Sequence, residues 1–294
     1  MKKAIVIFCC LAFIGLAFVN VGEFVSSAQR GVLLFGRNVM PILFPFFFVT
    51  SLLVELGFFS GFKRFGFTAP VFTLSLLGGY PTGARMLAEL YTRGEISRTQ
   101  AIRISTYTST CSPIFVIATV GACFYKSTSI GITIFICHII AAMINGLLYC
   151  KVRFQESENP LPLFGRVALK MPNINDSISN ALYSAIQNIF AIGGLIVTFF
   201  VLANQIQVVI SLNEEFNLAV AGILELTNGI HLASVTVPSY VLIPCAIVSF
   251  GGLAVAMQGF LFLKSFRMPF WFYLLYKGTH AIIAMLVCLL FVIP

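Results

Sequence analysis

Two short strings of this 294-residue sequence contain a pair of glycines and, after five further residues, a long polar side chain. Glycine pairs and proline interrupt a helix, and the helix that restarts presents unpaired N–H groups and a partial positive charge. Such a helix N-terminus favours an anion. We therefore predict that both strings bind an anionic substrate. Their residues are Gly78, Gly79, Tyr80, Pro81, Thr82, Gly83 and Arg85 in the first string, and Gly251, Gly252 and Gln258 in the second.

Glu225 is an acidic residue within a run of apolar residues, and Thr227 and Asn228 follow it closely. An ionisable group inside a membrane span is costly, so a functional role is the first hypothesis. We expect Glu225 to couple proton movement to transport or to orient the substrate, with Thr227 and Asn228 beside it. The alternative is a structural carboxylate that bonds to a backbone break or to Arg85. The pair Asn228-Gly229 predicts that the helix carrying Glu225 ends there.

Arg85 has two interpretations. A guanidinium can hold a carboxylate through two parallel hydrogen bonds, which predicts a substrate clamp. Alternatively, Arg85 is a loop charge or the partner of Glu89. The hydroxyl-rich kink Ser109–Pro113 either lines the same cavity or satisfies carbonyl groups that Pro113 leaves unpaired.

The composition indicates that a lipid bilayer surrounds most of this chain. Hydrophobic residues make up 59% of the sequence and charged residues only 10%, whereas soluble domains carry about 25% charged residues. At roughly 20 residues per crossing, the chain could hold about eight spans or part-spans. We therefore predict an all-α polytopic membrane protein in which the two Gly/Pro-broken segments form an internal repeat. The net charge of +8 is spread over short loops, which favours a topological role over nucleic-acid binding.

The N-terminus resembles a signal peptide, because Lys2 and Lys3 precede an apolar run from Ala4 to Val21. No clear cleavage site follows, so we expect an uncleaved first helix with a cytoplasmic N-terminus in the cell membrane. A single transmembrane domain then covers residues 1–294. Its expected parts are an N-terminal span within 1–30, a first repeat-like half over 38–124, a cytoplasmic loop over 151–176 and a second repeat-like motif region over 216–262.

Each expected half has an acid upstream of its glycine pair. Glu55 lies 24 positions before Gly79, and Glu225 lies 27 positions before Gly252. Paired, interrupted apolar segments in two halves of a chain point to the binding site of a transporter. The alternative is that the glycines permit close helix packing. Glu55 lies near the end of its span, where an interfacial role is expected. Parallel and inverted arrangements of the halves both remain open.

Motifs of soluble catalysis are absent from the sequence. We find no Walker motif, no GxSxG, no HExxH and no cluster of cysteine and histidine with metal-ligand spacing. We therefore expect no enzymatic activity, no cofactor and no metal. The expected partners are a small anionic molecule and the lipid bilayer, with homo-oligomerisation left open and nucleic acid excluded.

Three strings resemble the sporulation integral membrane protein YlbJ (SpoVV) family, which belongs with the nucleoside-recognition Gate domain membrane proteins. They are Gly78–Ala84, Glu225–Ile230 and Phe250–Gln258, within a likeness that runs from about Pro41 to Gln258. The resemblance implies secondary transport or facilitated movement of dipicolinic acid across the outer forespore membrane during sporulation.

Other functions remain open beside this resemblance. The family label also implies a link to nucleoside transporters, so a carrier of a nucleoside or another metabolite is one alternative. This chain is shorter than the usual family member, which leaves room for a paralogue with another substrate. A non-transporting scaffold for spore or envelope assembly is a further alternative.

Overall fold

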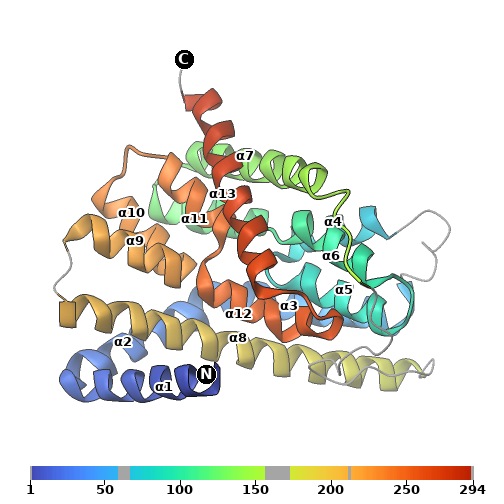
Figure 1. Cartoon of the computed structure of the whole chain (residues 1–294), viewed down its shortest axis with the longest axis horizontal. Coiled ribbons are helices and arrows are strands. Elements are labelled where there is room, and N and C mark those ends of the chain that lie inside the picture. The colour runs from blue at the N-terminus through green and yellow to red at the C-terminus, as the bar shows by residue number, and fades with distance from the viewer. Residues whose placement is uncertain (1, 59–66, 156–172, 211–212, 293–294) are drawn as a thin grey trace.

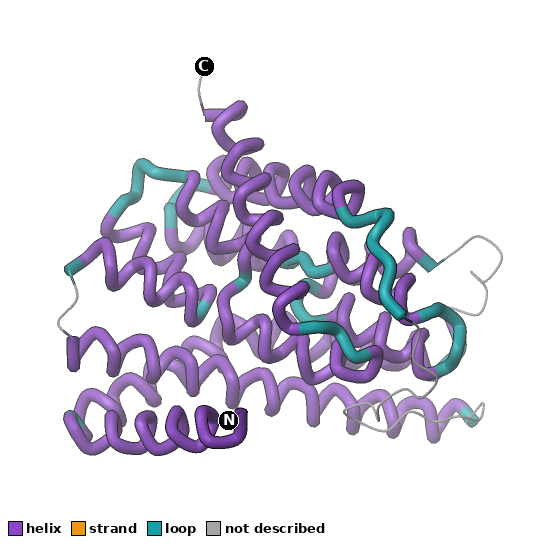
Figure 2. The backbone as a smooth tube through the Cα atoms, viewed as in Figure 1, coloured by secondary structure: helices purple, strands orange, loops and turns teal. Residues whose placement is uncertain are grey.

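The fold is taken from a computed structural model that describes residues 2–58, 67–155, 173–210 and 213–292. Helices and connecting loops make up this part of the chain, and it contains no strand (Figure 2). The predicted all-α class is therefore confirmed.

The helices follow one another as short and long segments (Figure 1). In chain order they are α1 (Lys2–Val19), α2 (Val21–Leu34), the π-helix η1 (Phe35–Val39), α3 (Met40–Glu55), α4 (Thr68–Gly78), α5 (Thr82–Thr92), α6 (Arg98–Thr108), the π-helix η3 (Ile114–Phe124), α7 (Thr128–Leu148), α8 (Ile174–Ile210), α9 (Glu214–Leu224), α10 (Leu226–Thr236), α11 (Leu242–Phe250), α12 (Gly252–Leu263), the 3₁₀-helix η4 (Lys264–Phe266) and α13 (Phe270–Val292).

Among the described residues, four helical segments are long and apolar enough to cross a membrane: Thr128–Leu148, Ile174–Ile210, Leu242–Phe266 and Phe270–Phe291. A fifth is possible if the bent pair α1 and α2 counts as one span. Shorter apolar helices lie between them. These are Leu43–Leu53, Thr68–Gly78 and Ile114–Phe124, and they are short enough to be part-spans. The expected total of about eight spans or part-spans stays a prediction.

The N-terminal region is not one straight span. α1 and α2 meet at an angle of 112°, and Asn20 lies between them. The Asn20 side chain accepts a hydrogen bond from the Glu23 N–H (3.1 Å) and so caps α2. This cap starts a new helix inside residues 1–30, where the apolar run alone predicted a single helix.

α8 is a continuous helix of 37 residues. At 1.5 Å per residue it is roughly 55 Å long, well beyond a hydrocarbon core of about 30 Å. It packs along α2 and α3 on one side of the molecule (Figure 1). Most of the predicted loop 151–176 lies outside the described residues.

Four helix pairs are each interrupted at a break. The breaks are residues 79–81 between α4 and α5, residues 109–113 between α6 and η3, Glu225 between α9 and α10, and Gly251 between α11 and α12. The two glycine breaks were predicted. The helix end predicted at Asn228-Gly229 is wrong, because α9 already ends at Leu224 and α10 runs through both residues. Gly229 instead lets α10 pack directly on Gly222 of α9.

The breaks pack against one another in two pairs. Gly79 has φ +69°, and a Cβ atom there would lie 2.9 Å from the Ser112 backbone nitrogen. Gly252 has φ +76°, and a Cβ atom there would lie 3.3 Å from the Ile223 carbonyl oxygen and from the Leu226 nitrogen. The break at Gly79 therefore lies against the break at 109–113, and the break at Gly251 lies against the break at Glu225. The internal repeat itself stays a prediction.

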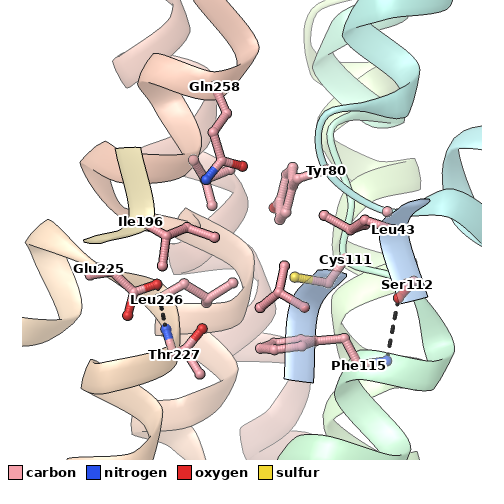
Figure 3. Close-up of a pocket in the computed structure, with 13 residues that line it drawn as sticks. Leu43, Tyr80, Cys111, Ser112, Phe115, Ile196, Glu225, Leu226, Thr227 and Gln258 are labelled. Atoms are coloured by element: carbon pink, nitrogen blue, oxygen red, sulfur yellow. Dashed lines mark hydrogen bonds between the residues drawn. The ribbon is translucent and has the colours of Figure 1, made fainter. Parts of the chain in front are cut away.

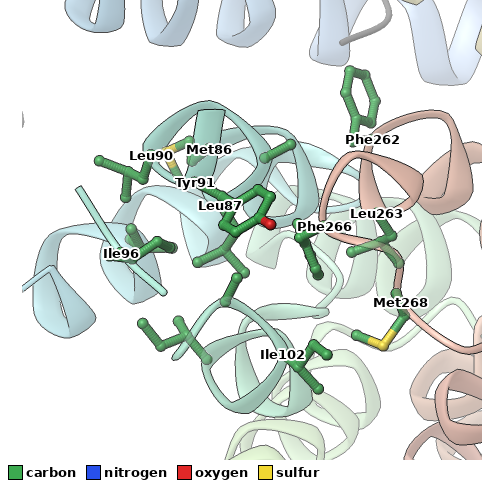
Figure 4. Close-up of a cluster of buried hydrophobic side chains, with 14 of the residues drawn as sticks. Met86, Leu87, Leu90, Tyr91, Ile96, Ile102, Phe262, Leu263, Phe266 and Met268 are labelled. Carbon is green, nitrogen blue, oxygen red and sulfur yellow. The ribbon is translucent and has the colours of Figure 1, made fainter. Parts of the chain in front are cut away.

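A cluster of buried apolar side chains joins the two halves (Figure 4). α5 contributes Met86 and Leu87, and α12 with η4 contributes Phe262 and Phe266, all of them fully buried. Between helices in a membrane, such side chains stabilise the contact through close van der Waals packing. The cluster therefore fixes α5 and α12, the helices that restart after the two glycine breaks, relative to each other.

Asn145 of α7 should be one of the most important polar residues for stability. Its Nδ2 donates to the carbonyl oxygens of Thr106 (2.9 Å) and Tyr276 (3.0 Å), which ties α7 to α6 and α13. Asn145→Ala would leave both carbonyls without this partner, so we expect a loss of about 2 kcal/mol in unfolding free energy. Thermal unfolding in detergent measures this loss.

Asn204→Ala is the matched control for that prediction. Asn204 Nδ2 donates only to the Phe200 carbonyl of its own helix (2.8 Å), so its replacement should change the melting temperature little. Equal melting temperatures for the Asn145 and Asn204 variants would contradict a cross-linking role of Asn145.

Candidate functional site

A cavity of about 530 Å³ lies where the four breaks meet (Figure 3). Every break, or the helix that restarts after it, contributes to the wall, and α3 and α8 close it with Leu43 and Ile196. Most of the surface is apolar. The polar side chains of the wall are Tyr80, Ser112, Glu225, Thr227 and Gln258.

Glu225 forms the break between α9 and α10 and is only 2% exposed. Its backbone is extended (φ −142°, ψ 122°), which turns the carboxylate back onto the first turn of α10. Oε1 accepts from the Thr227 N–H (3.1 Å) and Oε2 from the Asn228 N–H (2.7 Å). A carboxylate has about four acceptor positions, so two remain for a proton or for donors of a substrate. The partial positive charge of the helix N-terminus stabilises the carboxylate in place.

Ser112 has a matching role in the first half. Its Oγ accepts from the Phe115 N–H (3.3 Å) at the start of the π-helix η3. The cavity is therefore bordered by two helix N-termini, one capped by a carboxylate and one by a hydroxyl. π-Helices occur often at functional sites, and Phe115 of η3 presents its ring to the cavity (Figure 3).

Four of the other predicted residues are also at or next to this cavity. Gly79 lines it, Gln258 lines it from α12 with only 3% exposure, and Thr227 lies beside Glu225. Asn228 participates through its backbone N–H to Glu225. The Gln258 amide, which can both donate and accept, lies near the Tyr80 ring (Figure 3).

Arg85 does not line the cavity. It donates to the hydroxyls of Ser51 and Ser184 (2.8 Å to Ser184), which ties α5 to α3 and α8. Glu89 pairs instead with Arg93 at 2.7 Å. Position 85 lies on the face of α5 that packs on these scaffold helices. The clamp predicted for Arg85 therefore does not fit this geometry. Arg85 and Glu89 interact electrostatically, but the direct ion pair of Glu89 is with Arg93.

The remaining glycines of the first string are packing residues. A Cβ atom at Gly83 would collide with the Thr108 carbonyl, and one at Gly78 would collide with the buried Thr82 side chain. The close-packing alternative weighed for the glycines thus fits Gly78 and Gly83. Thr82 is fully buried at the start of α5 and does not line the cavity between the breaks.

Two other predicted residues surround Tyr80. The Tyr80-Pro81 peptide is cis, and Pro81 lines a smaller second cavity. Gly251 has φ +86°, and a Cβ atom there would lie 3.5 Å from Tyr80 Cζ. The Tyr80 hydroxyl donates to the Val248 carbonyl of α11 (3.3 Å). The first glycine string thus contacts the second directly through Tyr80.

Lys277 is not among the candidate site residues predicted from the sequence. It lies in α13 with no exposed surface, and its Nζ donates to the Tyr80 hydroxyl (2.5 Å) and to the Ser109 carbonyl (3.0 Å). Nζ is 4.6 Å from the Tyr80 ring centroid, a cation–π distance. The signal was available, because Lys277 is a cation within a long apolar run.

His138 is a buried structural link between two of the breaks. Its Nε2 accepts from the Cys111 N–H (3.0 Å), so its proton lies on Nδ1, 2.9 Å from the Ser249 hydroxyl. The ring also stacks on His280. Within the described residues, no group of three or more His, Cys, Asp or Glu side chains is placed to hold a metal ion.

Comparison with known proteins gives one informative relative. The chain is 25% identical over 308 residues to the "Sporulation integral membrane protein YlbJ" of Bacillus subtilis (strain 168), covering 87% of this chain and 75% of that protein. This chain is therefore similar to that protein over most of its length. No family model and no solved structure matches it. A membrane location for this YlbJ-like chain is supported by its relative and by its apolar helices.

Proposed function

We propose that this YlbJ-like protein carries a small organic anion across a membrane, with dipicolinate as the expected substrate. The cavity between the four breaks carries the proposal. Broken helices at membrane depth are tolerated where they are buried in protein or line a wet cavity. Transporters place their substrate between such interrupted helices, and N-termini of half-helices point at anionic groups.

The chemistry of the cavity suits a flat aromatic anion. Its wall is mostly apolar and carries a few polar side chains, as in most small-molecule sites. The rings of Tyr80 and Phe115 border it (Figure 3), so a planar ring can stack between apolar walls. The Ser112 hydroxyl and the Gln258 amide supply hydrogen-bond donors for carboxylate oxygens.

Glu225 gives the proposal its coupling step. An ionised carboxylate as buried as Glu225 repels an anion in the cavity strongly, because the surroundings have a low dielectric constant. The anion therefore binds when Glu225 carries a proton. The anion and the proton then cross the membrane together, so that less net charge is moved. In this account the N-terminus lies in the cytoplasm and the working membrane is the outer forespore membrane.

A neutral metabolite such as a nucleoside is the second candidate. The observation that favours a neutral substrate is the charge of the cavity wall. Glu225 is the formally charged residue among those that line the cavity, and its negative charge does not attract an anion. Its free acceptor positions would suit the hydroxyls of a sugar. The scaffold alternative gains no support from the fold, since the glycine breaks border a cavity instead of packing in lipid-facing helices.

Uptake by purified protein in liposomes tests these candidates. We expect radiolabelled dipicolinate to accumulate above the level of protein-free liposomes, and more strongly under an inward proton gradient. Unlabelled dipicolinate should compete, whereas a nucleoside should not. Uptake of the nucleoside without dipicolinate would favour the second candidate, and uptake of neither would return the scaffold to first place.

A further inference from the structure

Tyr80 lines two neighbouring cavities. The second cavity is smaller than the first, and the side chains of Tyr80 and Val255 line both. Its wall is rich in hydroxyl groups, contributed by Ser105, Thr108, Ser109, Tyr273 and Tyr276. A substrate that passes from the first cavity to the second would therefore pass the side chains of Tyr80 and Val255.

Lys277 fixes the position of the Tyr80 side chain by a hydrogen bond. Its ammonium donates to the Tyr80 hydroxyl and to the Ser109 carbonyl, and both residues line the second cavity. An ammonium has three N–H donors, so these two bonds leave one for another acceptor. The Lys277 ammonium thus contacts a side chain, that of Tyr80, which lines both cavities.

The charge of Lys277 is not neutralised by an acid in the part of the chain that the structure describes, where its hydrogen bonds are to a phenol and a carbonyl. A buried ion without a counter-ion costs several kcal/mol. Two neutral hydrogen bonds could be made by an uncharged donor. An anion that binds beside Nζ would stabilise the charged form of Lys277, so this position favours an anionic ligand.

We propose that Lys277 is the specificity-determining cation of the transport path and that Tyr80 is the movable wall in front of it. Rotation of the Tyr80 side chain joins the two cavities and brings a carboxylate of the substrate to Nζ, where it replaces the phenol as the hydrogen-bond partner. This inference rests on the proposed transport of an organic anion. It assigns to Lys277 the cationic role that the sequence predicted for Arg85.

Ligand-induced thermal stabilisation of the full-length protein in detergent tests the inference. The probes are pyridine-2,6-dicarboxylate and its uncharged analogue pyridine-2,6-dicarboxamide, which has the same shape. Wild type should be stabilised by the dicarboxylate and not by the dicarboxamide. Lys277→Met should weaken dicarboxylate binding at least about tenfold, within the range of one lost charged hydrogen bond. Lys277→Arg should retain most of it, and the exposed Lys151→Met controls for the change in net charge.

The melting temperature without ligand separates recognition from structure. Removal of an uncompensated buried charge should leave the melting temperature of Lys277→Met equal to or above that of wild type. Unchanged dicarboxylate binding by Lys277→Met would overturn the role of Lys277 and leave the proposed function standing. A lower melting temperature that Lys277→Arg does not restore would assign Lys277 a structural role and overturn the inference. Absence of binding by wild type would overturn both proposals.

Discussion

Replacement of Gly79 by leucine should abolish transport while the protein still inserts into the membrane. Gly79 has φ +69°, a conformation that costs any other residue, and a Cβ atom would approach the Ser112 nitrogen to 2.9 Å. Leucine would push the first break away from the second and deform the wall that both form. We expect dipicolinate uptake in liposomes to fall to the level of protein-free liposomes.

Gly194→Leu is the matched control for this change. Gly194 lies in α8, where an added Cβ atom would have nothing within 4 Å, and it is exposed on the helix surface. Its replacement adds the same apolar volume without touching a break, so uptake should stay near the wild-type rate. Normal uptake by Gly79→Leu would contradict the view that the break geometry forms the substrate path.

Replacement of Glu225 by glutamine should remove the response of uptake to a proton gradient. Glutamine resembles the protonated acid but cannot release the proton, so the coupling between proton and anion is lost. Couplings of about 1–3 kcal/mol correspond to roughly 5–150-fold effects, and we expect gradient-driven uptake to fall at least about tenfold within that range. Dipicolinate exchange without a gradient should persist, because the neutral side chain still permits the anion to bind.

Glu55→Gln provides the comparison for Glu225. Glu55 is the last residue of α3 and does not line the cavity. Its replacement should leave gradient-driven uptake close to normal. Equal uptake by the two variants, whether normal or reduced, would contradict a coupling role that is specific to Glu225.

The sequence predicted where the helices break better than it predicted which side chains meet at the breaks. Glycine pairs and proline disrupt helices through local backbone preferences, so the breaks at Gly79 and Gly251 could be anticipated. The kink at 109–113 was anticipated for the same reason. The break at Glu225 was not, because Asn228-Gly229 offered a stronger local stop signal. Its true basis is a side chain that caps the next helix, and this depends on a single extended residue.

The cations show where local patterns fail. Arg85 closes the first glycine string, yet its side chain points to Ser51 and Ser184 because tertiary packing decides which face of α5 meets α3 and α8. Lys277 lies 192 positions further along the chain and reaches the first string only through the packing of α13. Its position in an apolar run marked it as unusual, but its partners are set by contacts between distant segments.

A structure of the protein determined with dipicolinate bound tests the central claim most directly. The account predicts that the ligand lies in the cavity between the four breaks, with its ring against Phe115 and one carboxylate near Ser112 or Gln258. The claim would be contradicted by dipicolinate bound elsewhere, such as the apolar cavity lined by Leu218 and Ile247, or by an empty central cavity at a saturating concentration of dipicolinate.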